Sequence, residues 1–193
     1  MFFRDLKLKP TTMDVTLVEV RLPVRMGHRD AKKVFGEPLN RQLAATAMGT
    51  VTKVTVHEAG PDDICGITLY LGLRNASRES FDSVAKMLEF HHAPCGSSIR
   101  RTDGGEPLLF GATEGIEISI DSAHAPDAPS RRDLAKECAQ AMKGRAVNRG
   151  WIKRADRTVF YFYGDNLRSM QDKLRETFAS HPVLSTARAR RLA

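Results

Sequence analysis

The chain has 193 residues, of which 41% are hydrophobic and 27% charged, and its formal net charge is +7. This composition is typical of a folded soluble protein and excludes a disordered or fibrous one. No apolar run approaches the roughly 20 residues of a membrane-spanning helix, and the N-terminus lacks the apolar core of a signal peptide, so we expect a cytoplasmic protein.

The first 121 residues are expected to form one unit with the order β-α-β-β-α-β. Alternating apolar and polar residues predict its strands, and apolar residues spaced three and four apart predict its helices. The expected elements are a strand at 15–22, a basic loop at 25–33, a helix at 38–48, a hairpin of strands at 50–58 and 64–74, a helix capped by Ser77, and a strand at 115–121. This order predicts the α+β fold class and a ferredoxin-like sandwich, in which one antiparallel sheet has two helices on one face.

Residues 122–129 contain two prolines among small residues and predict a linker. Residues 130–193 are expected to form a smaller unit of order α-β-β-α-β, which packs on the first unit because its own core would be thin. Its expected elements are a helix from Ser130, strands at 150–156 and 157–163, a helix capped by Asp165, a short strand at 183–187, and a solvated basic terminus at 186–193.

The positive charge is concentrated in the second unit. Residues 1–125 carry 15 Lys and Arg against 16 Asp and Glu, a net of −1, whereas residues 126–193 carry 15 against 7, a net of +8. We expect this basic face to steer and orient an anionic partner, with one aromatic anchor. The candidate partner-binding residues are Lys143, Arg145, Arg149, Trp151, Lys153, Arg154 and Arg157.

Two kinds of partner fit such a face. An acidic protein is the first hypothesis, for example a toxin that is neutralised by an immunity protein. A single-stranded nucleic acid is the alternative, since basic residues neutralise phosphates and exposed rings stack on bases. That alternative needs exposed rings, but the run 159–163 is apolar on both faces and is typical of a central core strand. A solvated face without a partner also fits the composition.

No sequence pattern marks a catalytic or metal-binding site. Residues 91–95 hold two histidines and a cysteine, but they lack the paired spacing of a structural zinc site. Cys65, Cys95 and Cys138 are scattered without a CxxC pair and predict free thiols. We therefore predict a protein that works without catalysis, metal or cofactor, while an unrecognised enzyme stays open because sequence alone can hide a site.

Several short segments resemble bacterial proteins of unassigned function. They are a Phe-Gly-x-Pro-Leu helix start at 35–39, a Cys-x-Ile strand at 65–67, an Ala-Pro-x-Gly-Ser loop at 93–97, and the tail segments 160–164 and 181–182. The resemblance covers most of residues 35–182. It implies a small two-part α+β protein with a ferredoxin-like half that serves as a binding partner, and it implies no functional residues.

Overall fold

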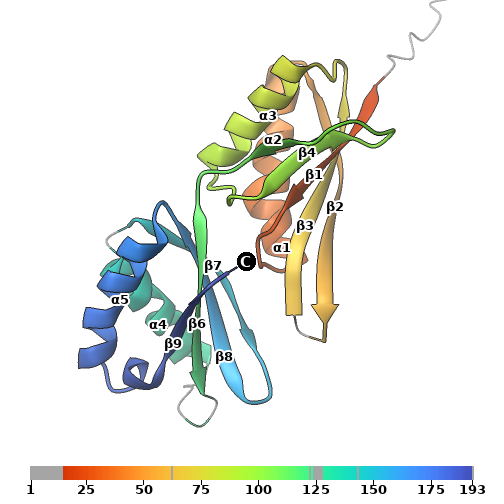
Figure 1. Cartoon of the computed structure of the whole chain (residues 1–193). Helices are drawn as coiled ribbons and strands as arrows, with labels where there is room; N and C mark the ends of the chain where they lie inside the picture. The colour runs from red at the N-terminus through yellow and green to blue at the C-terminus, as the bar shows by residue number, and fades with distance from the viewer. Residues whose placement is uncertain (1–14, 62, 122, 124–127, 143, 193) are drawn as a thin grey trace, which may run out of the picture.

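The computed structural model describes residues 15–61, 63–121, 123, 128–142 and 144–192. It contains two antiparallel sheets, each with helices on one face (Figure 1). The first sheet has the order β2-β3-β1-β4-β5. The elements of this unit are β1 (Thr16–Leu22), α1 (His28–Ala31), η1 (Lys32–Gly36), α2 (Glu37–Ala45), β2 (Gly49–Gly60), β3 (Asp63–Leu73), α3 (Arg78–Phe90), β4 (Ser97–Arg101) and β5 (Leu108–Phe110).

The second sheet has the order β7-β8-β6-β9, and helices α4 and α5 cover one of its faces (Figure 1). Its unit contains β6 (Glu114–Asp121), α4 (Ala128–Ala141), β7 (Ala146–Lys153), β8 (Arg157–Gly164), α5 (Leu167–Ser180), η2 (Leu184–Thr186) and β9 (Arg188–Arg191). In both units the first strand lies in the middle of the sheet, between the third and the fourth. The prediction of an α+β, ferredoxin-like fold is confirmed.

The expectation that residues 115–121 close the first sheet is wrong. This strand, β6, pairs with β8 and β9 in the second sheet, and β4 takes the expected place beside β1. The alternation of apolar residues predicts a strand and its buried face, but it does not identify the neighbouring strand. The second unit therefore has its own first strand and the full order β-α-β-β-α-β.

The expected linker at 122–129 follows β6 inside the second unit, and its residues 122 and 124–127 lie outside the described part of the chain. We propose that the boundary between the units lies instead at 111–113, after β5 and before β6.

Four shorter expectations also need correction. Residues 25–33 are not all loop, because helix α1 begins at His28. Helix α5 is capped by Asn166, whose side chain accepts a hydrogen bond from the backbone N–H of Ser169, and not by Asp165. The segment 183–187 contains the short helix η2 instead of a strand. The basic terminus forms strand β9, because residues 188–191 pair with β6. By contrast, Ser77 caps α3 as predicted.

Strand β8 is buried on both faces. Phe160 and Phe162 point toward α4 and α5, whereas Val159, Tyr161 and Tyr163 pack into the core of the first unit, and all five are at most 1% exposed. The aromatic run is therefore a central core strand, and its second face joins the two units.

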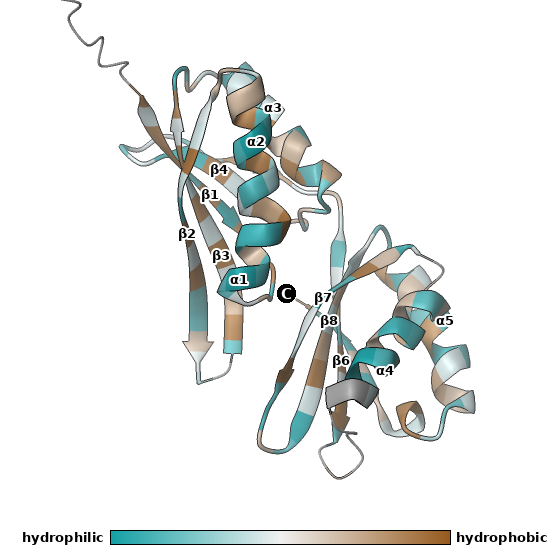
Figure 2. Cartoon of the chain, turned by 180° about the vertical axis from the view of Figure 1, so that it is seen from behind, coloured by the Kyte–Doolittle hydropathy of each residue, from teal (hydrophilic) through white to brown (hydrophobic). Residues whose placement is uncertain are grey.

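Figure 2 shows hydrophobic residues along β3 and hydrophilic ones along α1 and α4.

Candidate binding surface

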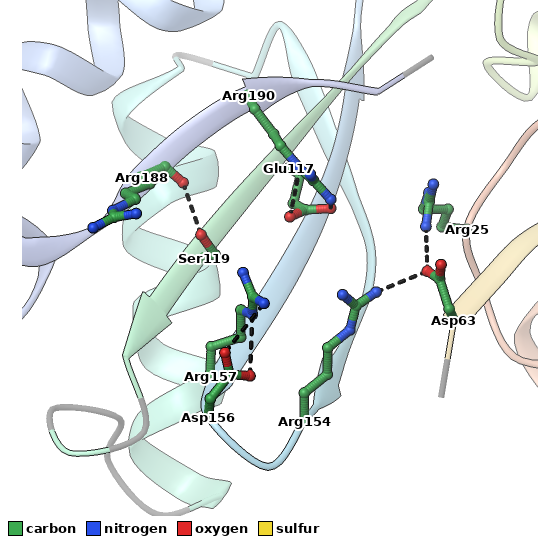
Figure 3. Close-up of polar contacts among 9 residues, drawn as sticks. All are labelled: Arg25, Asp63, Glu117, Ser119, Arg154, Asp156, Arg157, Arg188 and Arg190. Atoms are coloured by element: carbon green, nitrogen blue, oxygen red, sulfur yellow. Dashed lines mark hydrogen bonds and ion pairs between the residues drawn. The ribbon is translucent and has the colours of Figure 1, made fainter. Parts of the chain in front are cut away.

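The face of the second sheet that lies opposite α4 and α5 carries four arginines, Arg154, Arg157, Arg188 and Arg190, which we call the arginine face (Figure 3). Arg154 lies in the turn between β7 and β8, and Arg157 begins β8. Side chains two positions apart in a strand share a face, so Arg188 and Arg190 lie together on β9 while Ala189 packs toward the helices.

Three of these arginines contact carboxylates of the protein. Arg190 binds Glu117 through Nε and Nη2 at 2.9 and 3.0 Å, and the Glu117 side chain is 2% exposed. Arg157 contacts Asp156 at 3.1 Å, and Arg154 contacts Asp63 of the first unit at 2.7 Å. The side chains of Arg157 and Arg190 nevertheless remain 43% and 63% exposed, so both can contact a partner.

Arg188 differs from the other three arginines. It is exposed and forms no ion pair with any described residue. It lines a polar pocket of about 300 Å³ on the arginine face, together with Ser119, Asp121, Asp156, Arg157 and Thr186. The pocket thus brings together the unpaired guanidinium of Arg188 and that of Arg157, which is exposed and only weakly paired.

The structure brings together only two of the seven predicted partner-binding residues. Arg154 and Arg157 lie on the arginine face, whereas Trp151 lies on the helix-covered face of β7, opposite Phe160. Trp151 is 40% exposed, and the guanidinium of Arg131 lies 5.0 Å from the centre of its ring. Arg145 and Lys153 are exposed elsewhere on β7 or before it, and Lys143 lies outside the described residues.

Arg149 is turned into the junction between the two units. Its Nη2 donates a hydrogen bond to the backbone oxygen of His91, and its guanidinium lies 5.3 Å from the centre of the Phe35 ring. Burial lowers the pKa of Arg149 to about 10. This residue contacts the first unit and is not part of the arginine face.

Further polar contacts hold the same junction. Asp63 accepts hydrogen bonds from Arg25 at 2.6 Å and from Arg154 at 2.7 Å, and both arginines bind the same carboxylate oxygen (Figure 3). The hydroxyl of Tyr163 accepts a bond of 2.9 Å from the backbone N–H of Arg25, and burial raises the pKa of Tyr163 to about 12. Both units therefore contribute charged and polar groups to one contact.

Sequence reasoning missed Arg188 and Arg190 because it assigned them to a solvated terminus. The signal was the alternation of alanine and arginine over 187–190, which has the period of a half-buried strand with small residues on the covered face.

The described residues contain no group of three or more His, Cys, Asp or Glu that could hold a metal ion. Cys65 and Cys95 are exposed free thiols, whereas Cys138 is buried, which raises the pKa of its thiol to about 12. In the described part of the chain, every helix is too short or too polar to cross a bilayer.

No family model and no curated protein matches the chain. Solved structures that it resembles include the regulatory subunit of aspartate kinase from Thermus flavus, at 12% identity and a TM-score of 0.29 over 86% of this chain and 94% of that one. The first two RRM domains of yeast poly(U) binding protein match at 8% identity and 0.27, over 92% and 99%. Chlorite dismutase from Candidatus Nitrospira defluvii matches at 12% and 0.29, over 89% and 86%. Likeness at this level carries no argument about function.

Proposed function

We propose that the protein works by binding, without catalysis, and that the arginine face receives an acidic protein. The observation that carries the proposal is the placement of four guanidinium groups from β9 and the β7–β8 hairpin on one face of the second sheet (Figure 3). Guanidinium groups bind carboxylates in a planar, two-pronged geometry, and this makes arginine suited to recognising acidic side chains.

The existing ion pairs leave three of the four arginines able to contact a partner, whereas Arg154 is held by Asp63 and is only 21% exposed. Arg157 and Asp156 are both exposed, and an exposed pair contributes at most about 1 kcal/mol, so a partner carboxylate can replace Asp156 at little cost. Arg190 is fixed by Glu117 but keeps more than half of its side chain exposed. Arg188 needs no exchange, because it has no carboxylate partner among the described residues.

The burial of the aromatic residues favours a protein over a single-stranded nucleic acid. Binding of unpaired bases depends on exposed rings in a basic groove. Tyr161 and Tyr163 point to the same side of β8 as Arg157, but both are 1% exposed and packed against the first unit. The arginine face thus offers cations without a stacking platform, which suits carboxylates.

A capture experiment tests the proposal. The immobilised protein is incubated with an extract of its own organism, and the double variant Arg157→Gln/Arg188→Gln is run beside it. The matched control is Lys136→Gln/Arg175→Gln, which removes the same charge from α4 and α5 on the other side of the sheet. We expect a captured acidic protein to bind at least about tenfold more weakly to the first variant and unchanged to the control.

Equal binding of that protein to both double variants would contradict the proposal. Captured material that is removed by nuclease would instead favour the nucleic-acid alternative. An immunity-type inhibitor is the narrower form of the proposal, and it requires that co-expression rescues growth from a toxic partner. Such rescue should be lost with Arg157→Gln/Arg188→Gln.

A further inference from the structure

Arg149 is placed by a β-bulge. The pairing of β7 with β8 shifts between Asn148 and Gly150, so Arg149 is the extra residue on β7. Gly150 has φ +132°, a conformation that side chains disfavour, and it lets the strand resume after the bulge. Bulges re-aim a side chain away from the regular ladder and are common beside functional sites. Here the bulge turns Arg149 toward the first unit.

The guanidinium of Arg149 is a poorly compensated charge. Of its five N–H donors, Nη2 has a hydrogen-bond acceptor among the described residues, the backbone oxygen of His91, while Nε is buried and has none. It forms no ion pair with a described residue, and the negative face of the Phe35 ring is a weak substitute for a carboxylate. Buried charges in proteins are ordinarily paired, so this arrangement calls for a counter-charge.

Arg149 also lines a pocket of about 390 Å³ between the units, which we call the junction pocket. Met26, Asp30, Lys33 and Val34 of the first unit form one wall, and Asn148, Arg149 and Gly150 of β7 form the other. Its volume lies within the usual range for small-molecule sites, and sites of that kind are common between domains.

We propose that the junction pocket binds a small oxyanion, a carboxylate or a phosphate group, with Arg149 as its counter-charge. The site is separate from the arginine face and does not depend on the proposed function. Lys33 adds a second, exposed cation at the pocket, and Asp30 opposes it with one negative charge. Both residues are exposed where they line the pocket, so the removal of either charge should change the potential that a charged ligand meets there.

The charges predict opposite effects of neighbouring substitutions. Lys33→Gln removes an attraction and should weaken oxyanion binding by roughly threefold, whereas Asp30→Asn removes a repulsion and should strengthen it by a similar factor. Arg149→Gln removes the buried counter-charge and should weaken binding by at least about tenfold. A merely structural role of Arg149 gives no such pattern.

The test titrates the full chain with inorganic phosphate and, separately, with acetate, each at constant ionic strength set by sodium chloride. Binding is followed in every variant by the backbone amide resonance of Gly150 in two-dimensional NMR, since Gly150 lines the same pocket. In the unmodified chain it is also followed by the side-chain Nε–H resonance of Arg149, which is assigned by its loss in Arg149→Lys. We expect a saturable shift with at least one probe, and the tighter probe identifies the head group. Arg157→Gln, on the arginine face, is the matched control and should leave the affinity unchanged.

Absence of a saturable shift with both probes would overturn the proposal. Equal weakening by Arg157→Gln and Lys33→Gln would overturn it as well, since it would place binding on the arginine face or on the general positive charge. Should Arg149→Gln fail to fold, the opposite signs expected for Lys33→Gln and Asp30→Asn still decide, because both side chains are exposed.

Discussion

Glu117 shows how one residue can fix the position of another on the arginine face. Its carboxylate is 2% exposed and is bound at two points by Arg190, which also raises the pKa of Arg190. Removing one partner of such a pair leaves a buried charge without compensation, which is costly. The pair therefore stabilises the centre of the second sheet while it holds Arg190 at the surface.

We expect Arg190→Ala to lower the free energy of unfolding by roughly 2 kcal/mol, measured by urea denaturation. The control is Arg175→Ala, which breaks an exposed pair with Asp172 and should change stability by less than about 0.5 kcal/mol. Equal losses of unfolding free energy in the two variants would show that the burial of Glu117 does not make its ion pair more important for stability.

His91 gives the junction a pH dependence. Burial lowers its pKa, and the nearby charge of Arg149 lowers it further. The folded protein therefore protonates His91 at a lower pH than the unfolded chain, in which the pKa of His91 is near its ordinary value of 6.5. Its contribution to stability is complete above about pH 6.5 and is lost as the pH falls through the lowered value.

We expect His91→Gln to flatten the fall in unfolding free energy between about pH 7.5 and about pH 5, compared with the unmodified protein. Denaturation curves at several pH values measure this slope. Each series is compared with its own unfolding free energy at about pH 7.5, which removes any effect of the substitution that does not depend on pH. An unchanged slope would mean that protonation of His91 is not linked to folding.

At the scale of the elements, the sequence identifies most strands and helices but not the sheet to which each belongs. The sequence predicts the wrong sheet for strand β6 because its alternating isoleucines would fit either sheet equally well. The sequence does not predict strand β4 because its five residues, Ser-Ser-Ile-Arg-Arg, include only one apolar side chain. Pairing partners are set by contacts between distant segments, which periodicity does not contain.

The candidate site shows the same limit. Arg154 and Arg157 were found from the local density of charge, whereas Arg188 and Arg190 reach the arginine face only because β9 pairs with β6. The sequence places Arg149 with the other basic residues, although a bulge directs it to the junction. Composition therefore located the charge but could not divide it between two sites.

The connection between the units depends on a close approach at Gly111. Its φ is +113°, and a Cβ at this position would lie 1.9 Å from the backbone oxygen of Pro94. Gly104, in the loop before β5, has a similar φ of +121°, but a Cβ there would meet nothing within 4 Å. An alanine would be strained at either position because of the positive φ, but only at position 111 would its Cβ also clash with the backbone of Pro94.

We therefore expect Gly111→Ala to destabilise the protein by at least about 2 kcal/mol more than Gly104→Ala does, measured by thermal or urea denaturation. The second variant serves as the control for backbone strain alone. Similar losses in both would indicate that the backbone at Pro94 moves aside at little cost.

For the whole molecule, the central consequence of this fold is that β8 belongs to two cores. Its phenylalanines fill the core beneath α4 and α5, while Val159, Tyr161 and Tyr163 join the core of the first unit. The face of the second sheet opposite α4 and α5 is therefore covered in part by the first unit and exposed in part as the arginine face.

This shared strand predicts that the two units unfold together. Leu73→Ala tests it, because Leu73 is fully buried and ends β3, whereas Asp63 at the other end of this strand contacts Arg154 of the second unit. Truncating a buried leucine costs about 2–5 kcal/mol. Trp151, the single tryptophan of the chain, lies in β7 and reports the second unit by its fluorescence. We expect the urea midpoint of Trp151 fluorescence to fall together with that of the circular dichroism signal, whereas a midpoint that stays in place would show that the second unit folds independently of the first.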